Sequence, residues 1–263
     1  MIYNSKTTGS MSIGYSKDEL LNLIDDHELI SFDIFDTLVM RNVYFNKDVF
    51  QIVSQKCSEM GIPGFYEARI EAENYFMGSH YPFVEEIYAY LEEKLKISPG
   101  ISREIMEYEI DTEKKVILPR NTVSEIFEYC VKCKKKVYIV SDMYIHRRDL
   151  EKILSGLGIK GYEKMFVSCE YGVAKNRGLF NCYLKEVPAG SCLHVGDSIE
   201  CDILPAAQCN IDTFRLKTAA EMWEKQGGRV PQDLSERTQI AHMIAKDYND
   251  PFRETVFRRR SDE

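Results

Sequence analysis

Short apolar runs of the kind that form buried strands occur once near the start of this chain and again in its second half, with a long helical stretch between them. The first run is Glu28–Phe32. The later runs are Lys136–Val140, Met165–Ser168, Cys192–Val195 and Thr213–Leu216. Helical periodicity fills the spaces between the later runs, as in a parallel sheet with helices on both faces. We therefore expect an α/β, Rossmann-like core whose parallel sheet has five or more strands.

Four consecutive helical segments interrupt this alternation after the first strand. They are Lys47–Met60, Tyr66–Met77, Phe83–Leu95 and Ser102–Val116. No run rich in Val or Ile separates them, so this stretch does not continue the sheet. An inserted α-helical domain explains the interruption.

These patterns divide the chain into four parts. Residues 1–15 are polar without a period, and we expect a mobile tail there. Residues 16–42 and 118–217 are the predicted core, residues 43–117 the inserted helical cap, and residues 218–263 a C-terminal helical extension and tail. Two segments that are distant in sequence therefore build one sheet.

Composition narrows the classes of partner. The chain carries 42 acidic and 34 basic residues, for a formal net charge of −8. Bulk attraction to nucleic acid or to an anionic membrane is therefore not expected. No apolar stretch approaches the roughly 18 residues that span a bilayer, and no secretory signal is recognisable. We expect a cytoplasmic protein with a small-molecule partner.

Polar residues follow the predicted strands at four points. They are Asp33, then Ser141 with Asp142, then Lys175 in a loop, then Asp197. In a parallel sheet such strand ends lie along one edge, where ligands bind. Carboxylates suit a hard cation, while a hydroxyl and an ammonium suit phosphate oxygens. The set indicates phosphoryl transfer, with Asp33 attacking phosphorus to form an aspartyl-phosphate.

In this order, the segments resemble the four motifs of the haloacid dehalogenase-like (HAD) superfamily. The resemblance covers residues 25–217 and includes the form G-D-x(4)-D from Gly196 to Asp202. It implies Asp33 as nucleophile, Ser141 as phosphate ligand, Lys175 as charge stabiliser, Asp197 as magnesium ligand, and Asp202 in support of the metal or the lysine.

The resemblance also implies a magnesium site and a substrate site. The implied metal ligands are Asp33, the backbone carbonyl of Phe35, Asp197 and Asp202. Thr37, which aligns with the threonine of the family, and Asp142 are implied to bind substrate. The insertion lies where members with a helical cap carry it, and such a lid would exclude water and contact the substrate. Arg69 could reach the substrate from the cap, or form an exposed helix pair with Glu73.

One position departs from the D-x-D-x-T pattern of typical HAD phosphatases. Phe35 stands where a second aspartate protonates the leaving alcohol, a contribution worth roughly 100- to 10,000-fold. Asp36 follows directly, but neighbouring residues of an extended segment face opposite ways, so it would act as acid or base only if the chain turned sharply. A leaving group that needs little protonation, or feeble phosphatase activity, would also explain Phe35.

Three classes of function remain open on these residues. The first is a magnesium-dependent phosphatase or phosphotransferase acting on a small phosphate ester, with sugar phosphates as candidates. The second is a haloacid dehalogenase, where an aromatic residue at this position is also found, or a phosphonate hydrolase using Lys47, Lys94 or Lys96. The third is a catalytically weak binding module.

The paired carboxylates Asp197 and Asp202 argue against the dehalogenase, because they would repel Asp33 unless a cation were bound. The stretches Ser31–Arg41 and Ser141–Tyr144 also look like those of HAD proteins associated with bacterial glycosyltransferases, which makes such an enzyme an expected partner.

Overall fold

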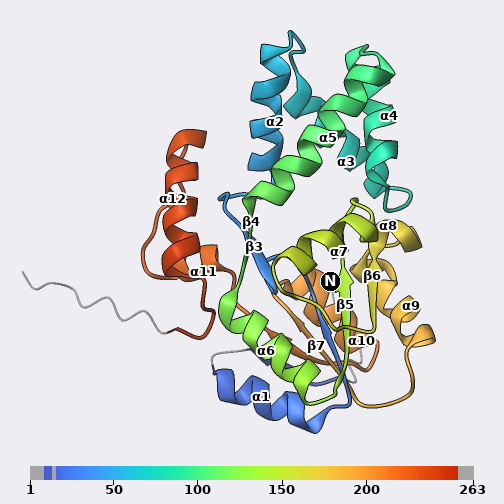
Figure 1. Cartoon of the computed structure of the whole chain (residues 1–263), viewed down its shortest axis with the longest axis vertical. Coiled ribbons are helices and arrows are strands. Elements are labelled where there is room, and N and C mark those ends of the chain that lie inside the picture. The colour runs from blue at the N-terminus through green and yellow to red at the C-terminus, as the bar shows by residue number, and fades with distance from the viewer. Residues whose placement is uncertain (1–8, 14–15, 254–263) are drawn as a thin grey trace, which may run out of the picture.

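The computed structural model describes residues 9–13 and 16–253 of the chain. Its central feature within this part is a six-stranded sheet in which all neighbouring strands are parallel (Figure 1). From one edge to the other, the strands are β1 (Met11–Ile13), β8 (Asp212–Arg215), β7 (Cys192–Gly196), β2 (Leu29–Phe32), β5 (Lys136–Ser141) and β6 (Lys164–Val167). The expected α/β fold is confirmed, and β2, β5, β6, β7 and β8 overlap the five apolar runs.

Successive side chains of a strand point to opposite sides of the sheet, and all four residues of β2 are buried. Both faces of the sheet are therefore covered. Ile30 and Phe32 of β2 belong to one core cluster, whereas Leu29 belongs to a second cluster on the other face. The first cluster includes α1 (Lys17–Asp26), α6 (Asn121–Lys132) and α7 (Arg147–Gly156), and it continues into the inserted helices between residues 48 and 116. The second cluster includes α9 (Leu179–Glu186) and α10 (Leu204–Gln208).

The edge strand β1 lies inside the segment that was expected to be a mobile tail. Met11 pairs with Thr213 of β8, so this part of the expectation is wrong. Three residues are too few for an alternating pattern to be visible in the sequence. Gly9 allows the close approach, because a Cβ there would lie 2.2 Å from the carbonyl oxygen of Ile211. The remaining positions of the expected tail, 1–8 and 14–15, lie outside the described residues.

Four helices between β2 and β5 form a separate layer above the sheet, which we call the helical unit (Figure 1). They are α2 (Asp48–Glu59), α3 (Phe65–Met77), α4 (Val84–Leu95) and α5 (Pro99–Val116). Two antiparallel linker strands, β3 (Val39–Arg41) and β4 (Ile117–Pro119), join the unit to the core. No helix in the described part of the chain has the length and apolar content to cross a membrane.

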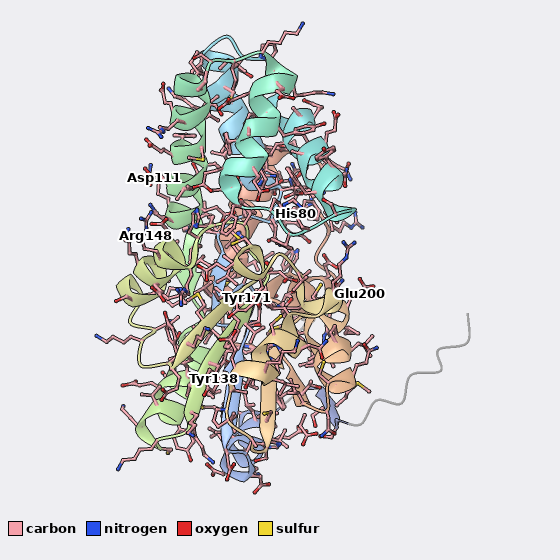
Figure 2. All side chains as sticks on the ribbon, turned by 90° about the vertical axis from the view of Figure 1, so that its right-hand side faces the viewer. His80, Asp111, Tyr138, Arg148, Tyr171 and Glu200 are labelled. Atoms are coloured by element: carbon pink, nitrogen blue, oxygen red, sulfur yellow. The ribbon has the colours of Figure 1, made fainter. Side chains whose placement is uncertain are left out.

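The loop between α3 and α4 rests on the core. The backbone N–H of Tyr81 donates to the carbonyl of Gly172 (3.0 Å), just after α8 (Ser168–Tyr171), and that of Val84 donates to Tyr144 (2.9 Å). Figure 2 shows His80, in this loop, at the end of the helical unit that faces the core. The helical unit is therefore in direct contact with loops at the carboxyl edge of the sheet.

The C-terminal extension packs against the linker strands. Its helices are α11 (Ala219–Lys225) and α12 (Leu234–Asp247), and they share a cluster of buried residues with Met40 and Tyr44. Arg237 of α12 forms an ion pair with Asp48 of α2, with Nε 3.0 Å from Oδ1. Arg120, beyond β4, is buried and donates to the carbonyls of Lys217 and Asn249. The extension thus contacts the core and the helical unit at once. The basic run from Arg258 to Arg260 lies outside the described residues.

Candidate active site

Asp33 lies directly after β2, at the centre of the carboxyl edge of the sheet. Its backbone N–H donates to the carbonyl of Val195 on β7 (2.9 Å), and the preceding residue, Phe32, pairs with Ile139 of β5. The residue is only 4% exposed. Burial raises the pKa of its carboxyl group to about 7, although the ammonium of Lys175 acts in the opposite direction. The candidate nucleophile is therefore held rigidly and largely out of water.

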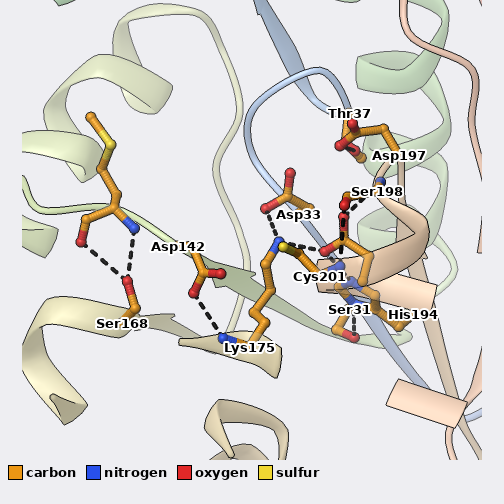
Figure 3. Close-up of polar contacts among 12 residues, drawn as sticks. Ser31, Asp33, Thr37, Asp142, Ser168, Lys175, His194, Asp197, Ser198 and Cys201 are labelled. Atoms are coloured by element: carbon orange, nitrogen blue, oxygen red, sulfur yellow. Dashed lines mark hydrogen bonds and ion pairs between the residues drawn. The ribbon is translucent and has the colours of Figure 1, made fainter. Parts of the chain in front are cut away.

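Lys175 connects Asp33 to a second carboxylate (Figure 3). It begins the short 3₁₀ helix η1 (Lys175–Arg177), and its Nζ lies 2.7 Å from Oδ1 of Asp33 and is also paired with Asp202. Burial disfavours the ammonium, but Asp202, Asp33 and Asp142 together raise the pKa of Lys175 well above its ordinary value. Lys175 is therefore a permanent cation beside Asp33.

Sequence reasoning missed the residues that hold Asp202 in place. Asp202 belongs to the π-helical turn η2 (Ile199–Ile203), and it accepts the N–H of Ser198 (3.0 Å) and faces Nε2 of His194 (3.2 Å). Burial lowers the pKa of His194, so a neutral ring can donate to Asp202 while its Nδ1 accepts the hydroxyl of Ser31 (2.9 Å). Ser31 and His194 are opposite each other in β2 and β7. Two polar residues at paired positions of buried strands were the available signal.

Three carboxylates gather at this point. Asp33, Asp197 and Asp202 each offer an oxygen atom, and these atoms lie within 4.8 Å of one another. Gly196 permits this, because a Cβ there would lie 2.5 Å from the Cβ of Asp202. Burial and the charges of Asp202 and Asp33 raise the pKa of Asp197 well above its ordinary value. We call Asp33, Lys175, Asp197 and Asp202 the acid site.

The donor set of the acid site fits a divalent cation. Carboxylate oxygens are the ligands that Mg²⁺ and Ca²⁺ prefer, and a bound cation relieves repulsion among them. Magnesium therefore suits the residues present.

Two hydroxyl groups flank the acid site. Ser141, at the end of β5, is fully buried, and its Oγ has no hydrogen-bond partner among the described residues. Leaving a buried hydroxyl unpaired costs about 1–3 kcal/mol, so an anion bound there would satisfy it. Thr37 donates from Oγ1 to Oδ1 of Asp197 at 3.5 Å. The hydroxyl groups expected to bind phosphate and substrate thus lie at the same strand edge as the carboxylates.

The two residues at the departure from the family pattern face different surroundings. The ring of Phe35 is buried under the guanidinium of Arg41, 3.9 Å from the ring centroid, and Arg41 is paired with Glu113 of α5. The chain does turn sharply at Asp36, which has a φ of 57°. Asp36, however, lines a cavity of about 190 Å³ beside Arg41 and Thr218, which we call the hinge cavity.

A larger cavity, of about 430 Å³, lies between the helical unit and the core, and we call it the interface cavity. Its wall on the helical unit comes from α3, the following loop and Ile87 of α4, and includes Glu73 and Tyr81. Its wall on the core includes Asp142 and Cys201, which follow Ser141 and precede Asp202 in the chain. Oδ1 of Asp142 accepts the backbone N–H of Lys175 at 2.9 Å. The interface cavity therefore ends beside the acid site.

Arg69 is neither an exposed helix residue nor part of either cavity wall. It is fully buried inside the helical unit, where its Nη2 lies 3.0 Å from Oε1 of Glu109. Its guanidinium also stacks on Phe50 and lies over Tyr144 of the core. The pair with Glu73 exists (3.3 Å), but on a buried arginine. The expectation of an exposed pair is wrong because a charged residue in a helical pattern does not reveal a buried partner on another helix.

Comparison with solved structures places the fold. Two structures of L-2-haloacid dehalogenase from Xanthobacter autotrophicus, one with chloropropionic acid covalently bound, match with a TM-score of 0.50 and 14% sequence identity. Each match covers 83% of this chain and 87% of the dehalogenase chain. A HAD phosphatase from Thermococcus onnurineus matches with a TM-score of 0.48 and 16% identity, over 77% of this chain and 99% of that one.

No protein-family model matches the sequence, and no curated protein matches it either. The likeness is therefore one of structure, at a level of identity that speaks for the fold alone. Three observations indicate the same fold: the order of the strands, the position of Asp33 at a strand end, and the match to the dehalogenase structures. This chain has the haloacid dehalogenase-like fold.

Proposed function

We propose that this chain is a magnesium-dependent phosphatase or phosphotransferase that acts on a small phosphate ester through an aspartyl-phosphate intermediate. The observation that carries the proposal is the surroundings of Asp33. It is buried at a strand end, 2.7 Å from the ammonium of Lys175 and beside the carboxylates of Asp197 and Asp202. A nucleophile next to a fixed cation and a cation-binding carboxylate set suits attack on an anionic phosphoryl group.

The residues of the site have distinct roles in this proposal. Asp33 attacks phosphorus, and Lys175 balances negative charge on the phosphoryl oxygens. The unpaired hydroxyl of Ser141 donates to one of these oxygens, and Thr37 and Asp142 border the bound substrate. Magnesium, held by Asp33, Asp197, Asp202 and the backbone carbonyl of Phe35, would supply further neutralisation of the phosphoryl charge.

The identity of the substrate is a finer proposal. The interface cavity has the size of sites that hold small molecules, and it ends beside the acid site. A small sugar phosphate is the substrate class we favour. Location in the cytoplasm and association with a glycosyltransferase are further proposals that rest on the sequence.

Phosphate release tests the proposal. Wild-type protein with Mg²⁺ should release inorganic phosphate from members of a panel of sugar phosphates and other phosphomonoesters. Chelator should stop the release, and Asp33→Asn should reduce it by at least 1000-fold, an order of magnitude typical for removal of a covalent nucleophile. Asp111→Asn, at an exposed position of α5, is the control. Equal release by wild type and Asp33→Asn would rule the proposal out.

A haloacid dehalogenase is the second candidate, because Phe35 occupies the position of the second aspartate. Halide release from short 2-haloacids in the presence of chelator would favour it. The structure offers less support for a phosphonate hydrolase, since none of the described Lys47, Lys94 and Lys96 side chains lines the interface cavity, and Lys94 is paired with Glu71. Magnesium binding without turnover of any substrate would favour a binding module.

A further inference from the structure

When the leaving group is an alcohol, the proposed reaction needs a proton at the leaving oxygen, and neither Phe35 nor Asp36, in the loop after Asp33, lines the interface cavity. Phe35 takes the position where a second carboxyl group would stand, and its ring is covered by Arg41. The carboxyl group of Asp36 lines the hinge cavity, whereas the interface cavity next to the acid site is lined by other residues. A proton donor must therefore come from elsewhere in the chain.

Only two carboxyl groups of the described residues line the interface cavity, those of Glu73 and Asp142. Glu73 lies on α3 and is engaged by the guanidinium of Arg69, 3.3 Å away. Asp142 lies on the core, directly after Ser141. Its Oδ1 accepts the N–H of Lys175, the residue whose Nζ holds Asp33. Asp142 alone therefore combines a place in the cavity wall with direct contact to the acid site (Figure 3).

The surroundings of Asp142 suit a group that carries a proton between turnovers. Burial raises the pKa of its carboxyl group, although Lys175 acts in the opposite direction. A raised pKa brings a carboxyl group closer to the range in which general acids work at neutral pH. The backbone N–H of Lys175 bonds Oδ1 of this carboxyl group and the hydroxyl of Ser168 is a second hydrogen-bond partner, while Asp142 also lines the interface cavity.

We infer that Asp142 is the general acid and base of this site and takes over the task of the absent second aspartate. The inference rests on the proposed phosphoryl transfer. Oδ of Asp33 forms a bond to phosphorus while the bond from phosphorus to the leaving oxygen breaks, and that oxygen takes the electron pair. The carboxyl group of Asp142 gives its proton to this oxygen, which yields the alcohol and a carboxylate.

The second half of the reaction returns the proton. The Asp142 carboxylate removes a proton from a water molecule as the water oxygen attacks phosphorus. The bond between phosphorus and Oδ of Asp33 breaks, and the electron pair returns to the Asp33 carboxylate. Inorganic phosphate leaves, and Asp142 is again protonated. Proton and electron counts are balanced without any further reactant.

The test compares two leaving groups in matched carboxamide variants. A general acid matters for an alkyl phosphate, whose alcohol is a poor leaving group, and little for p-nitrophenyl phosphate, whose phenol leaves without protonation. Asp142→Asn should therefore lower kcat for the alkyl ester by roughly 100- to 10,000-fold and for the nitrophenyl ester by less than about tenfold. Glu73→Gln and Asp36→Asn should change both rates by the same factor. Retained turnover of the nitrophenyl ester shows that the Asp142→Asn site is folded.

A second measurement varies the leaving group over a graded series. In the wild type, kcat/KM across a series of aryl phosphates should depend only weakly on the pKa of the leaving phenol, and in Asp142→Asn the dependence should become steep. A selective loss in Glu73→Gln or Asp36→Asn, or an equal loss for both esters in Asp142→Asn, would overturn the inference while leaving the proposed function intact. If the wild type turned over neither ester, both the inference and the proposed function would be rejected.

Discussion

Two clusters of buried charge lie one above the other in this molecule, and their charge balance differs. At the helical unit, Arg69 faces Glu109 at 3.0 Å, and Arg41 of the linker strand β3 faces Glu113 at 2.8 Å, so each buried guanidinium has a buried carboxylate of its own. Glu73, which is partly exposed, also pairs with Arg69. In the acid site, three carboxylates face the single ammonium of Lys175. A balanced cluster is complete as folded, whereas an unbalanced one gains from an added cation. The difference separates a structural cluster from a site.

The largest loss of stability should follow from removing one charge of a buried ion pair in the helical unit. Glu109→Gln leaves Arg69 buried without its main counter-charge, which should cost about 3–5 kcal/mol of unfolding free energy. Urea unfolding measures this loss. Asp111→Asn, two residues along the same helix but exposed and paired only with Lys114, should change stability by less than about 0.5 kcal/mol. A loss below about 1 kcal/mol in Glu109→Gln would contradict the structural reading.

The acid site should show its imbalance as a pH dependence in chelator. The pKa of Asp33 is raised from 3.8 to about 7 in the folded protein, and that of Asp197 is raised as well. Between pH of about 4 and 7, the folded state therefore binds more protons than the unfolded state. The free energy of unfolding should consequently fall as pH rises through this range. A pKa difference of one unit corresponds to about 1.4 kcal/mol, so Asp33 alone should account for a fall in unfolding free energy on the order of 4 kcal/mol across this pH range.

Urea unfolding at several pH values measures this slope. Saturating Mg²⁺ should flatten it, because the cation replaces the proton as the counter-charge. Asp33→Asn in chelator should also show a shallower slope. Stability that rises across this window in the metal-free wild type would contradict the charge imbalance.

A smaller effect should come from reducing the imbalance by one charge. In the wild type, Mg²⁺ at 100 times its dissociation constant should add about 2.7 kcal/mol of unfolding free energy. Asp197→Asn should lose most of this gain but, in chelator, exceed the wild type by about 1 kcal/mol, because one repelling carboxylate is gone. Thermal unfolding with and without Mg²⁺ measures both. If Asp197→Asn were less stable than the wild type in chelator, repulsion among the three carboxylates would not be what limits the stability of the metal-free protein.

Much of the fold could be predicted because its strands are apolar runs of four to six residues. The edge strand β1 was not predicted because three residues carry no period, and because its partner β8 is distant in the sequence, with Met11 paired to Thr213. Arg69 was misjudged for a related reason. Its burial depends on Glu109 and Phe50, which lie on other helices and cannot be associated with it by spacing.

The convergence of Asp33, Lys175, Asp197 and Asp202 could be predicted because parallel strands end at one edge. The spacing of residues in the sequence could not show which cavity each carboxylate residue faces. Asp36 and Asp142 are both carboxylates next to motif residues, yet they line different cavities. The roles assigned to these residues stay predictions until the variants are measured.

The ion pair between Arg237 and Asp48 has a kinetic consequence. Asp33 is only 4% exposed, so we expect exchange of substrate and product to involve movement of the helical unit relative to the core. Because α12 holds the first residue of α2 through this buried pair, such a movement about the linker strands would work against the pair. We therefore expect the C-terminal extension to slow the movement, so that a contact outside the acid site affects the rate at which substrate enters and product leaves.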